Sequence, residues 1–171
     1  MVIRRETLGD RAAVDAVISA AFGQPASDTT PGETTLVQAL RRDPGWIEAL
    51  SLVATRNRQI VGHVVCTRGW VGELAALGLG PISVLPESQR QGIGQALMHC
   101  VIGAADAAGE PLIALLGDHR FYGRFGFVEA SKVGILAPDP GWGAHFQVRT
   151  LTDCPASLAG TFRYAAPFEH L

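Results

Sequence analysis

The segment Gln89-Arg90-Gln91-Gly92-Ile93-Gly94-Gln95-Ala96 has the residue types and spacing to bind a negatively charged phosphate group. Gly92 and Gly94 allow a tight turn and a close approach of a ligand to the backbone. The free N–H groups at a helix start point to one spot, where the helix dipole favours negative charge. The segment therefore predicts a pyrophosphate site, unless the glycines merely allow a strand and a helix to pack closely.

Two common phosphate-binding loops do not fit this segment. The chain lacks the GxxxxGK[ST] pattern of nucleotide hydrolases, and it lacks the full GxGxxG pattern with a downstream acid that dinucleotide-dependent enzymes use. Both of these enzyme classes are disfavoured.

The elements that must position the loop form a strand, a helix and a second strand. We predict strands over 79–85 and 112–116, and between them a helix that ends at Gly109. This order implies a right-handed crossover. Pro81 cannot donate a hydrogen bond within a sheet, so it predicts a bulge or an unpaired edge beside which a ligand could insert. The apolar positions predicted to form the buried stripe of the helix are Ile93, Ala96, Leu97, Cys100, Val101, Ala104 and Ala108.

Hydrophobic periodicity and turn residues predict the other elements. The predicted strands are 2–5, 52–55, 60–67, one starting at 126, and 146–151 as the last; the predicted helices are 10–22, 33–42 and a short one at 118–124. The polar loop 24–32 and the segment 138–144 are candidate acceptor loops, but they carry no recognisable substrate code.

Composition limits the functional classes. The chain has 171 residues, 47% of them hydrophobic and 18% charged, which predicts one globular domain. A net charge of −2 and the absence of long basic runs argue against a nucleic-acid partner. The charged N-terminus and the lack of an 18-residue apolar run predict neither a signal peptide nor a membrane span. Three cysteines outside any metal-ligand spacing predict no disulfide framework and no metal site, and favour the cytoplasm.

Two motifs resemble the GNAT superfamily of N-acetyltransferases. The segment 89–94 matches the family pattern Q/R-x-x-G-x-G/A, and 80–87 looks like its fourth strand and the exit from it. The block Phe121-Tyr122-Gly123-Arg124-Phe125-Gly126-Phe127 resembles the family's Y-x-x-x-G-F and is similar to that of a bacterial YhbS-like subgroup. The resemblance covers about residues 1 to 150 in element order.

The resemblance implies an α/β (α+β) fold over a single domain, residues 1–171. This fold has a mixed, mostly antiparallel sheet of six to seven strands, splayed between strands 4 and 5, with about four flanking helices. It also implies acetyl-CoA as the co-substrate and an amine as the acceptor, on a small molecule or a protein. The implied cofactor-binding residues are Ile82, Ser83, Val84, Gln89, Arg90, Gln91, Gly92, Ile93, Gly94 and Gln95, with the amides of 91–95 on the pyrophosphate and 82–84 along the pantetheine arm.

The family usually lets the amine attack the thioester directly, so two protons must be handled. A lysine-like amine is neutral in only about one molecule in 2,500 at pH 7, a deficit of about 4.6 kcal/mol, so a base or a water relay is needed. By its place in the motif, Tyr122 is the expected general acid or hydrogen-bond donor to the sulfur, although a merely packed tyrosine is the alternative. The base stays open among Glu73, His63, Asp118 and His119.

Two other readings compete with an enzyme. The same groove could sense acyl-CoA without turnover, or both motifs could be coincidental in an interaction protein. Dimerisation is common among related proteins, and an exposed sheet edge would also allow a homodimer.

Overall fold

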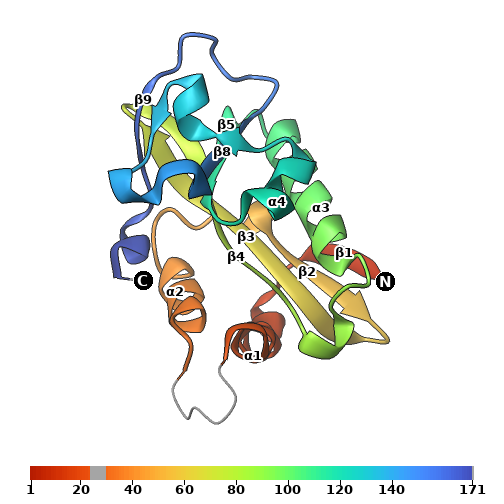
Figure 1. Ribbon diagram of the computed structural model, residues 1–171. Coiled ribbons are helices and arrows are strands. Elements are labelled where there is room, and N and C mark those ends of the chain that lie inside the picture. Colours follow the sequence, from red (N-terminus) through yellow and green to blue (C-terminus); the bar gives the residue numbers. More distant parts are fainter. Residues whose placement is uncertain (24–29, 171) are drawn as a thin grey trace.

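The computed structural model describes residues 1–23 and 30–170 and shows a twisted mixed sheet with helices on both faces (Figure 1). The main path of the sheet runs β1-β2-β3-β4-β5-β8-β6. The strands are β1 Val2–Arg5, β2 Ser51–Arg56, β3 Gln59–Val71, β4 Leu74–Val84, β5 Leu112–Leu116, β6 Val128–Glu129, β7 Ile135–Leu136, β8 Phe146–Thr150 and β9 Gly160–Arg163. Only β4 with β5 and β7 with β9 pair in parallel among the described strands.

Two tight turns build the central hairpins. Asn57 and Arg58 have φ of 49° and 65°, the left-handed values that a two-residue hairpin turn requires, and they join β2 to β3 where the sequence predicts a turn. Gly72, with φ of 57°, turns β3 into β4. Pairing of β3 with β4 continues from Arg68 to Val71, beyond the end of the predicted strand 60–67. The hairpin is therefore longer at that end than predicted.

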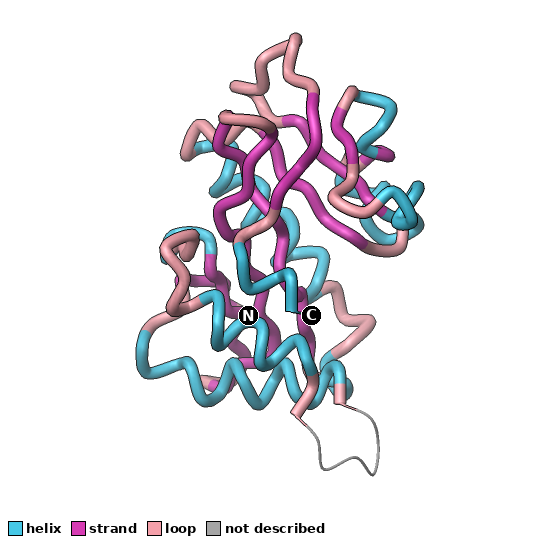
Figure 2. The backbone as a smooth tube through the Cα atoms, turned by 90° about the vertical axis from the view of Figure 1, so that its left-hand side faces the viewer, coloured by secondary structure: helices cyan, strands magenta, loops and turns pink. Residues whose placement is uncertain are grey.

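The α-helices divide between the two faces of the sheet. Val14, Ile18 and Val37, from α1 and α2, pack with Val53 and Val65 on one face, whereas α3 packs on the other. Figure 2 shows that α1 and α2 lie at one end of the molecule and the C-terminal strands at the other. The helices are α1 Arg11–Phe22, α2 Gly32–Leu40, α3 Ile93–Ala107 and α4 His119–Tyr122; the 3-10 helices are Leu8–Asp10, Glu48–Leu50, Pro86–Ser88, Gly123–Phe125, Ala130–Val133, Pro140–His145 and Ala166–His170.

Most of the predicted loop 24–32 lies outside the described residues. No helix in the described part of the chain has the length and apolar character to cross a membrane.

Helix α3 packs closely on β3 because Gly62 has no side chain. A Cβ at Gly62 would lie 3.0 Å from Leu97 and 3.1 Å from Ile93. The predicted apolar stripe is partly wrong: Cys100 and Ala108 are exposed. Met98, Ile102 and Ala105 are buried in their place, because the face of the helix that packs on the sheet is rotated about the helix axis relative to the predicted stripe.

The prediction that 146–151 is the last strand is wrong. The later strand β9 pairs with the end of β3 through Trp70–Arg163 and Val71–Phe162, and in parallel with β7. Only Phe162 of its four residues is buried, and its ring lies against Gly69. Such a short segment carries no periodic signal, so long-range pairing alone makes it a strand.

Strands β4 and β5 separate almost at once, as the family resemblance implies. Their parallel pairing covers only Leu77–Ile113 and Gly78–Ala114. On its other side β4 carries the irregularity expected at Pro81, because the register with β3 jumps between the pairs Cys66–Leu79 and Val64–Ile82. From 79 to 84, β4 therefore has no described strand on its β5 side.

A buried charged cluster ties the N-terminus to both helices of one face. Arg41 lies 2.7 Å from Glu6, which follows β1, and 2.6 Å from Asp15 of α1. The side chain of Arg41 is only 4% exposed and that of Glu6 only 5%. Because charges this buried lose their hydration, each depends on its partners for stabilisation.

Replacing Arg41→Ala should lower the free energy of unfolding by about 3–5 kcal/mol, because it leaves two carboxylates without their cation. Urea denaturation measures the change, and Arg42→Ala, at the exposed neighbouring position, is the control expected to stay within about 0.5 kcal/mol. Equal small effects of both variants would contradict a stabilising role for the cluster.

Stability should fall in acid through Glu6. Burial alone would raise the pKa of Glu6, but hydrogen bonds with His63 and Ser51 and the charge of Arg41 outweigh it and lower the pKa. The unfolded chain then binds a proton more readily, so this contribution is complete above the ordinary pKa of about 4.3 and is lost as the pH falls through the lowered value. The stability difference between wild type and Glu6→Gln should therefore shrink from pH 7 to pH 3. The exposed control Glu48→Gln should show no such trend, and a pH-independent difference for Glu6→Gln would refute the assignment.

Candidate active site

A cavity of about 520 Å³ lies between the end of β4 and the start of α3, with the α4 region as its third wall. It opens where β4 has left β5, so the splay of the sheet creates it. Eight of the ten residues predicted to bind the cofactor line it; the lining residues are Ile82, Val84, Ser88, Gln89, Arg90, Gly92, Ile93, Gly94, Gln95, Phe121 and Arg124.

The glycine loop has the backbone that phosphate binding requires. Arg90 and Gly92 have φ of 58° and 81°, and such a positive φ at a non-glycine residue is a local strain often found at functional sites. No side chain caps the N-terminus of α3. A Cβ at Gly92 would meet nothing within 4 Å. The first N–H groups of α3 therefore face open space that an anionic group fits.

The backbone of β4 presents alternate residues to the gap. Leu85 N–H donates to Val61 O at 2.9 Å, and in an antiparallel pair every second residue bonds the same neighbour. Ser83, paired with His63, therefore uses its backbone within the sheet, while Ile82 and Val84 turn theirs toward the open side. Within the predicted segment 82–84, the backbones of Ile82 and Val84 therefore face the gap, whereas that of Ser83 bonds within the sheet.

The side chains of Gln89 and Gln91 hold the glycine loop in place through hydrogen bonds to nearby backbone carbonyls. Gln89 Nε2 donates to Val84 O at 3.1 Å. Gln91 does not line the cavity; its amide donates to Glu87 O at 3.1 Å and accepts from Arg56 at 2.5 Å. The side chain of Gln91 thus stabilises the turn, and only its backbone remains a candidate ligand.

Phe121 and Arg124 also line the cavity, although the motifs did not mark them as cofactor-binding residues. The guanidinium of Arg124 lies 4.9 Å from the centre of the Phe121 ring and adds positive charge to the cavity. Both residues belong to the motif block that contains Tyr122. The positive charge of Arg124, two residues after the tyrosine, is the sequence feature that could have identified them.

Tyr122 is packed in an aromatic cluster beside this cavity. Its ring makes edge contacts with Phe121 and Phe127, at centroid distances of 4.9 and 6.0 Å. Gly117 leaves room for it, since a Cβ there would lie 2.3 Å from the ring. Burial raises the pKa of Tyr122 to about 12. The phenol therefore remains protonated at neutral pH and is a donor.

Tyr164, from a segment without diagnostic motifs, lies at the apex of the splay. Its ring occupies the space that a side chain at Gly78 would fill, with Cδ1 2.6 Å from the ideal Cβ position. Gly78 is in the last β4–β5 pair. Burial raises the pKa of Tyr164, and the nearby Tyr122 adds to the shift. The structure thus brings the two tyrosines of the chain into one region.

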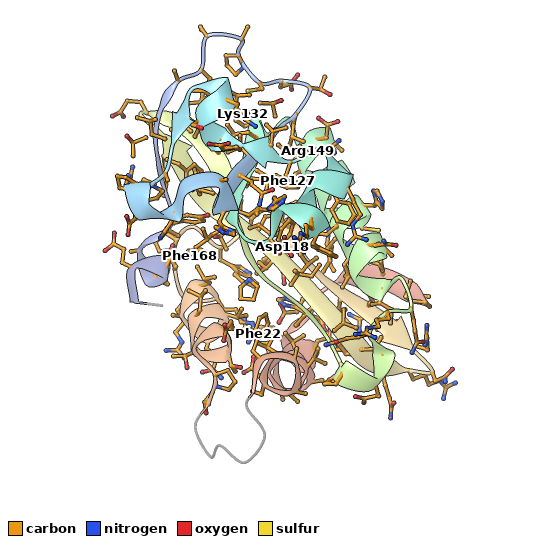
Figure 3. The ribbon with its side chains drawn as sticks, in the orientation of Figure 1. Phe22, Asp118, Phe127, Lys132, Arg149 and Phe168 are labelled. Atoms are coloured by element: carbon orange, nitrogen blue, oxygen red, sulfur yellow. The ribbon has the colours of Figure 1, made fainter. Side chains whose placement is uncertain are left out.

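The four candidate bases lie in different places. Glu73 lies in the exposed turn before β4, about 30 Å of strand from the cavity, so it cannot serve. Asp118, near the centre of Figure 3, caps α4 by accepting from Arg120 N–H at 2.9 Å. Asp118 and His119 are both about two-thirds exposed. His63 is fully buried, and burial lowers its pKa despite the neighbouring Glu6.

Comparisons with known proteins agree with this geometry. Residues 48–129 match the model of the acetyltransferase (GNAT) domain. The N-acetyltransferase YjhQ of Escherichia coli is 34% identical over 145 residues, with 80% of each chain covered. The GNAT family N-acetyltransferase YhbS of E. coli, solved in complex with CoA, superposes with a TM-score of 0.87 at 29% identity, covering 98% of this chain and 91% of that one. A GNAT family acetyltransferase from Brucella melitensis, in complex with acetyl-CoA, gives 0.78 at 33% identity, with 98% and 97% covered.

The sequence relationship to YjhQ, the matching domain model and the splayed sheet lead to one conclusion. This chain belongs to the GNAT family of N-acetyltransferases.

Proposed function

We propose that the chain is a single-domain enzyme, residues 1–171, that transfers an acetyl group from acetyl-CoA to a primary amine of a small molecule or protein. The amine attacks the thioester directly in a ternary complex. The observation that carries this proposal is the cavity that joins the open side of β4 to the uncapped N-terminus of α3. Two solved relatives contain CoA or acetyl-CoA, which supports the same co-substrate here.

Different residues of this chain bind the pyrophosphate and the pantetheine arm of the co-substrate. The N–H groups at the start of α3 hold the pyrophosphate, and Arg90 and Arg124 add positive charge around it. The backbones of Ile82 and Val84 bind the pantetheine arm as a neighbouring strand would. When bound there, acetyl-CoA supplies the activated acetyl thioester.

Tyr122 assists the departing sulfur mainly by a hydrogen bond. A thiol has a reference pKa near 8.5, whereas burial raises the pKa of Tyr122 to about 12. Complete proton transfer from the phenol to the thiolate would therefore be uphill by about 5 kcal/mol. The phenol keeps its proton and stabilises the developing negative charge.

Wild-type protein should bind acetyl-CoA with a micromolar Kd in calorimetric titration. Gly94→Glu and Gly92→Glu should each weaken binding by about 100-fold or more, because a carboxylate would stand where the pyrophosphate is held. Gly94 is the cleaner test, since its φ is not positive. Gly103→Glu, on the exposed side of the same helix, is the matched control and should bind as wild type. No binding by wild type would contradict the proposal.

Tyr122→Phe should lower kcat by about 10- to 100-fold and leave the Kd of acetyl-CoA within about twofold. Activity should not fall between pH 8 and 10 through loss of the Tyr122 proton, because the raised pKa keeps the phenol protonated. Single-turnover thiol release with a panel of amines measures both effects. An unchanged single-turnover rate in Tyr122→Phe would contradict the role of Tyr122 as a hydrogen-bond donor. Wild type that binds acetyl-CoA without releasing thiol would favour an acyl-CoA sensor.

A further inference from the structure

Buried polar side chains lie on neighbouring strands from the N-terminus to β4. Ser51 Oγ donates to Glu6 Oε2 at 2.5 Å and lies 3.0 Å from His63 Nε2, which is itself 3.5 Å from the same carboxylate oxygen. His63 pairs in register with Ser83 of β4. Both of these side chains are buried, at 0% and 2% exposed.

The hydrogen-bond directions define the tautomer of His63. Because the Ser51 hydroxyl donates to Glu6, its oxygen accepts from the ring, so Nε2 carries the proton. Nδ1 is then a bare lone pair. Within residues 1–23 and 30–170, Nδ1 is buried and has no hydrogen-bond partner.

Ser83 supplies the complementary atom. Its hydroxyl is also buried and without a partner among the described residues. Direct partners on antiparallel strands project from the same face with Cβ atoms about 5 Å apart, so the Ser83 hydroxyl lies beside His63, although this structure has no hydrogen bond between Ser83 Oγ and His63 Nδ1. Ser83 stands between Ile82 and Val84, the residues whose backbones face the cavity.

The surrounding charges favour a proton at His63. The charged groups that face the cluster are Glu6 after β1, Asp15 of α1 and Arg41 at the end of α2. With a neutral imidazole these three sum to one net negative charge, and a proton on His63 brings the sum to zero. Burial opposes this protonation, so the imidazole is neutral at rest.

We propose that Ser83 and His63, backed by Ser51 and Glu6, form the proton relay that receives the proton of the acceptor amine. This inference rests on the proposed acetyltransferase function. It assigns a base where the sequence left four candidates, and it gives Ser83 a role through its side chain rather than its backbone.

The Ser83 hydroxyl first turns to donate to His63 Nδ1. The incoming ammonium then gives one proton to Ser83 Oγ while the proton of that hydroxyl moves to His63 Nδ1, leaving an imidazolium beside Glu6. The freed nitrogen lone pair forms the C–N bond as the C–S bond breaks and sulfur takes that electron pair. The second N–H proton passes to sulfur, which Tyr122 hydrogen-bonds, and His63 later releases its proton to solvent.

The first test needs no substrate. A variant that keeps His63 as its only histidine, with the other four replaced by glutamine, is examined by nitrogen-15 NMR at pH 7. The relay requires a neutral ring with the proton on Nε2. A proton on Nδ1, or an imidazolium at this pH, overturns it whether or not the protein proves to be an acetyltransferase.

The second test uses the pH dependence of kcat/KM with the most reactive primary amine of a panel of aliphatic, aromatic and peptide amines. Ser83→Ala and His63→Gln should each lose about 10- to 100-fold at pH 7. The loss should shrink as the pH approaches 10, because solvent then deprotonates the amine. A purely structural defect would lower the rate equally at every pH.

Controls separate this proposal from the function on which it rests. Ser83→Ala should keep the wild-type Tm or raise it, because it removes an unpaired buried hydroxyl. Thr67→Val removes another buried hydroxyl without a partner among the described residues and should leave the pH profile unchanged. If wild type binds acetyl-CoA and releases thiol, and Ser83→Ala and His63→Gln keep its pH profile of kcat/KM, only the relay is overturned. Wild type that binds no acetyl-CoA overturns the acetyltransferase, and the NMR result then decides the proton arrangement alone.

Discussion

The separation of β4 from β5 is the constraint on which the rest of the site depends. Two parallel pairs hold the strands together, and beyond Gly78 the backbone of β4 loses its neighbour on that side. Unpaired backbone groups in a protein interior are costly, so a sheet opens in this way only where another partner satisfies them. The bulge opposite Val65, around Pro81, interrupts pairing on the β3 side of the same stretch of β4, and the crossover through α3 places a helix N-terminus at the mouth of the opening.

Interactions on both faces of the sheet stabilise the region around that opening. Helix α3 packs against the sheet through Gly62, which sets the position of the glycine loop. On the other face, the charged cluster of Glu6, Asp15 and Arg41 holds β1, α1 and α2 together. The same cluster surrounds His63, so the interaction that stabilises the N-terminal half also sets the electrostatics behind Ser83.

The aromatic residues of the C-terminal half close the site from a third direction. Tyr122 fits because Gly117 has no side chain, and Tyr164 reaches the apex because Gly78 has none. Phe162 fills the space above Gly69 in the same way. Three glycines of the sheet region thus admit three aromatic rings. Two of these rings, Phe162 and Tyr164, come from a segment distant in sequence, which couples the late strand β9 to the cofactor side of the fold.

The sequence by itself determined the glycine loop, the helix that follows it, the parallel neighbour strand and the place where Pro81 interrupts pairing, because each depends on local conformational preferences. It also located Tyr122 through a family motif. Only the tertiary structure decided that Glu73 is remote and that Ser83 turns its backbone into the sheet, since these depend on strand length and register. The pairing of Ser83 with His63 and the arrival of Tyr164 at Gly78 are long-range contacts that no local pattern encodes.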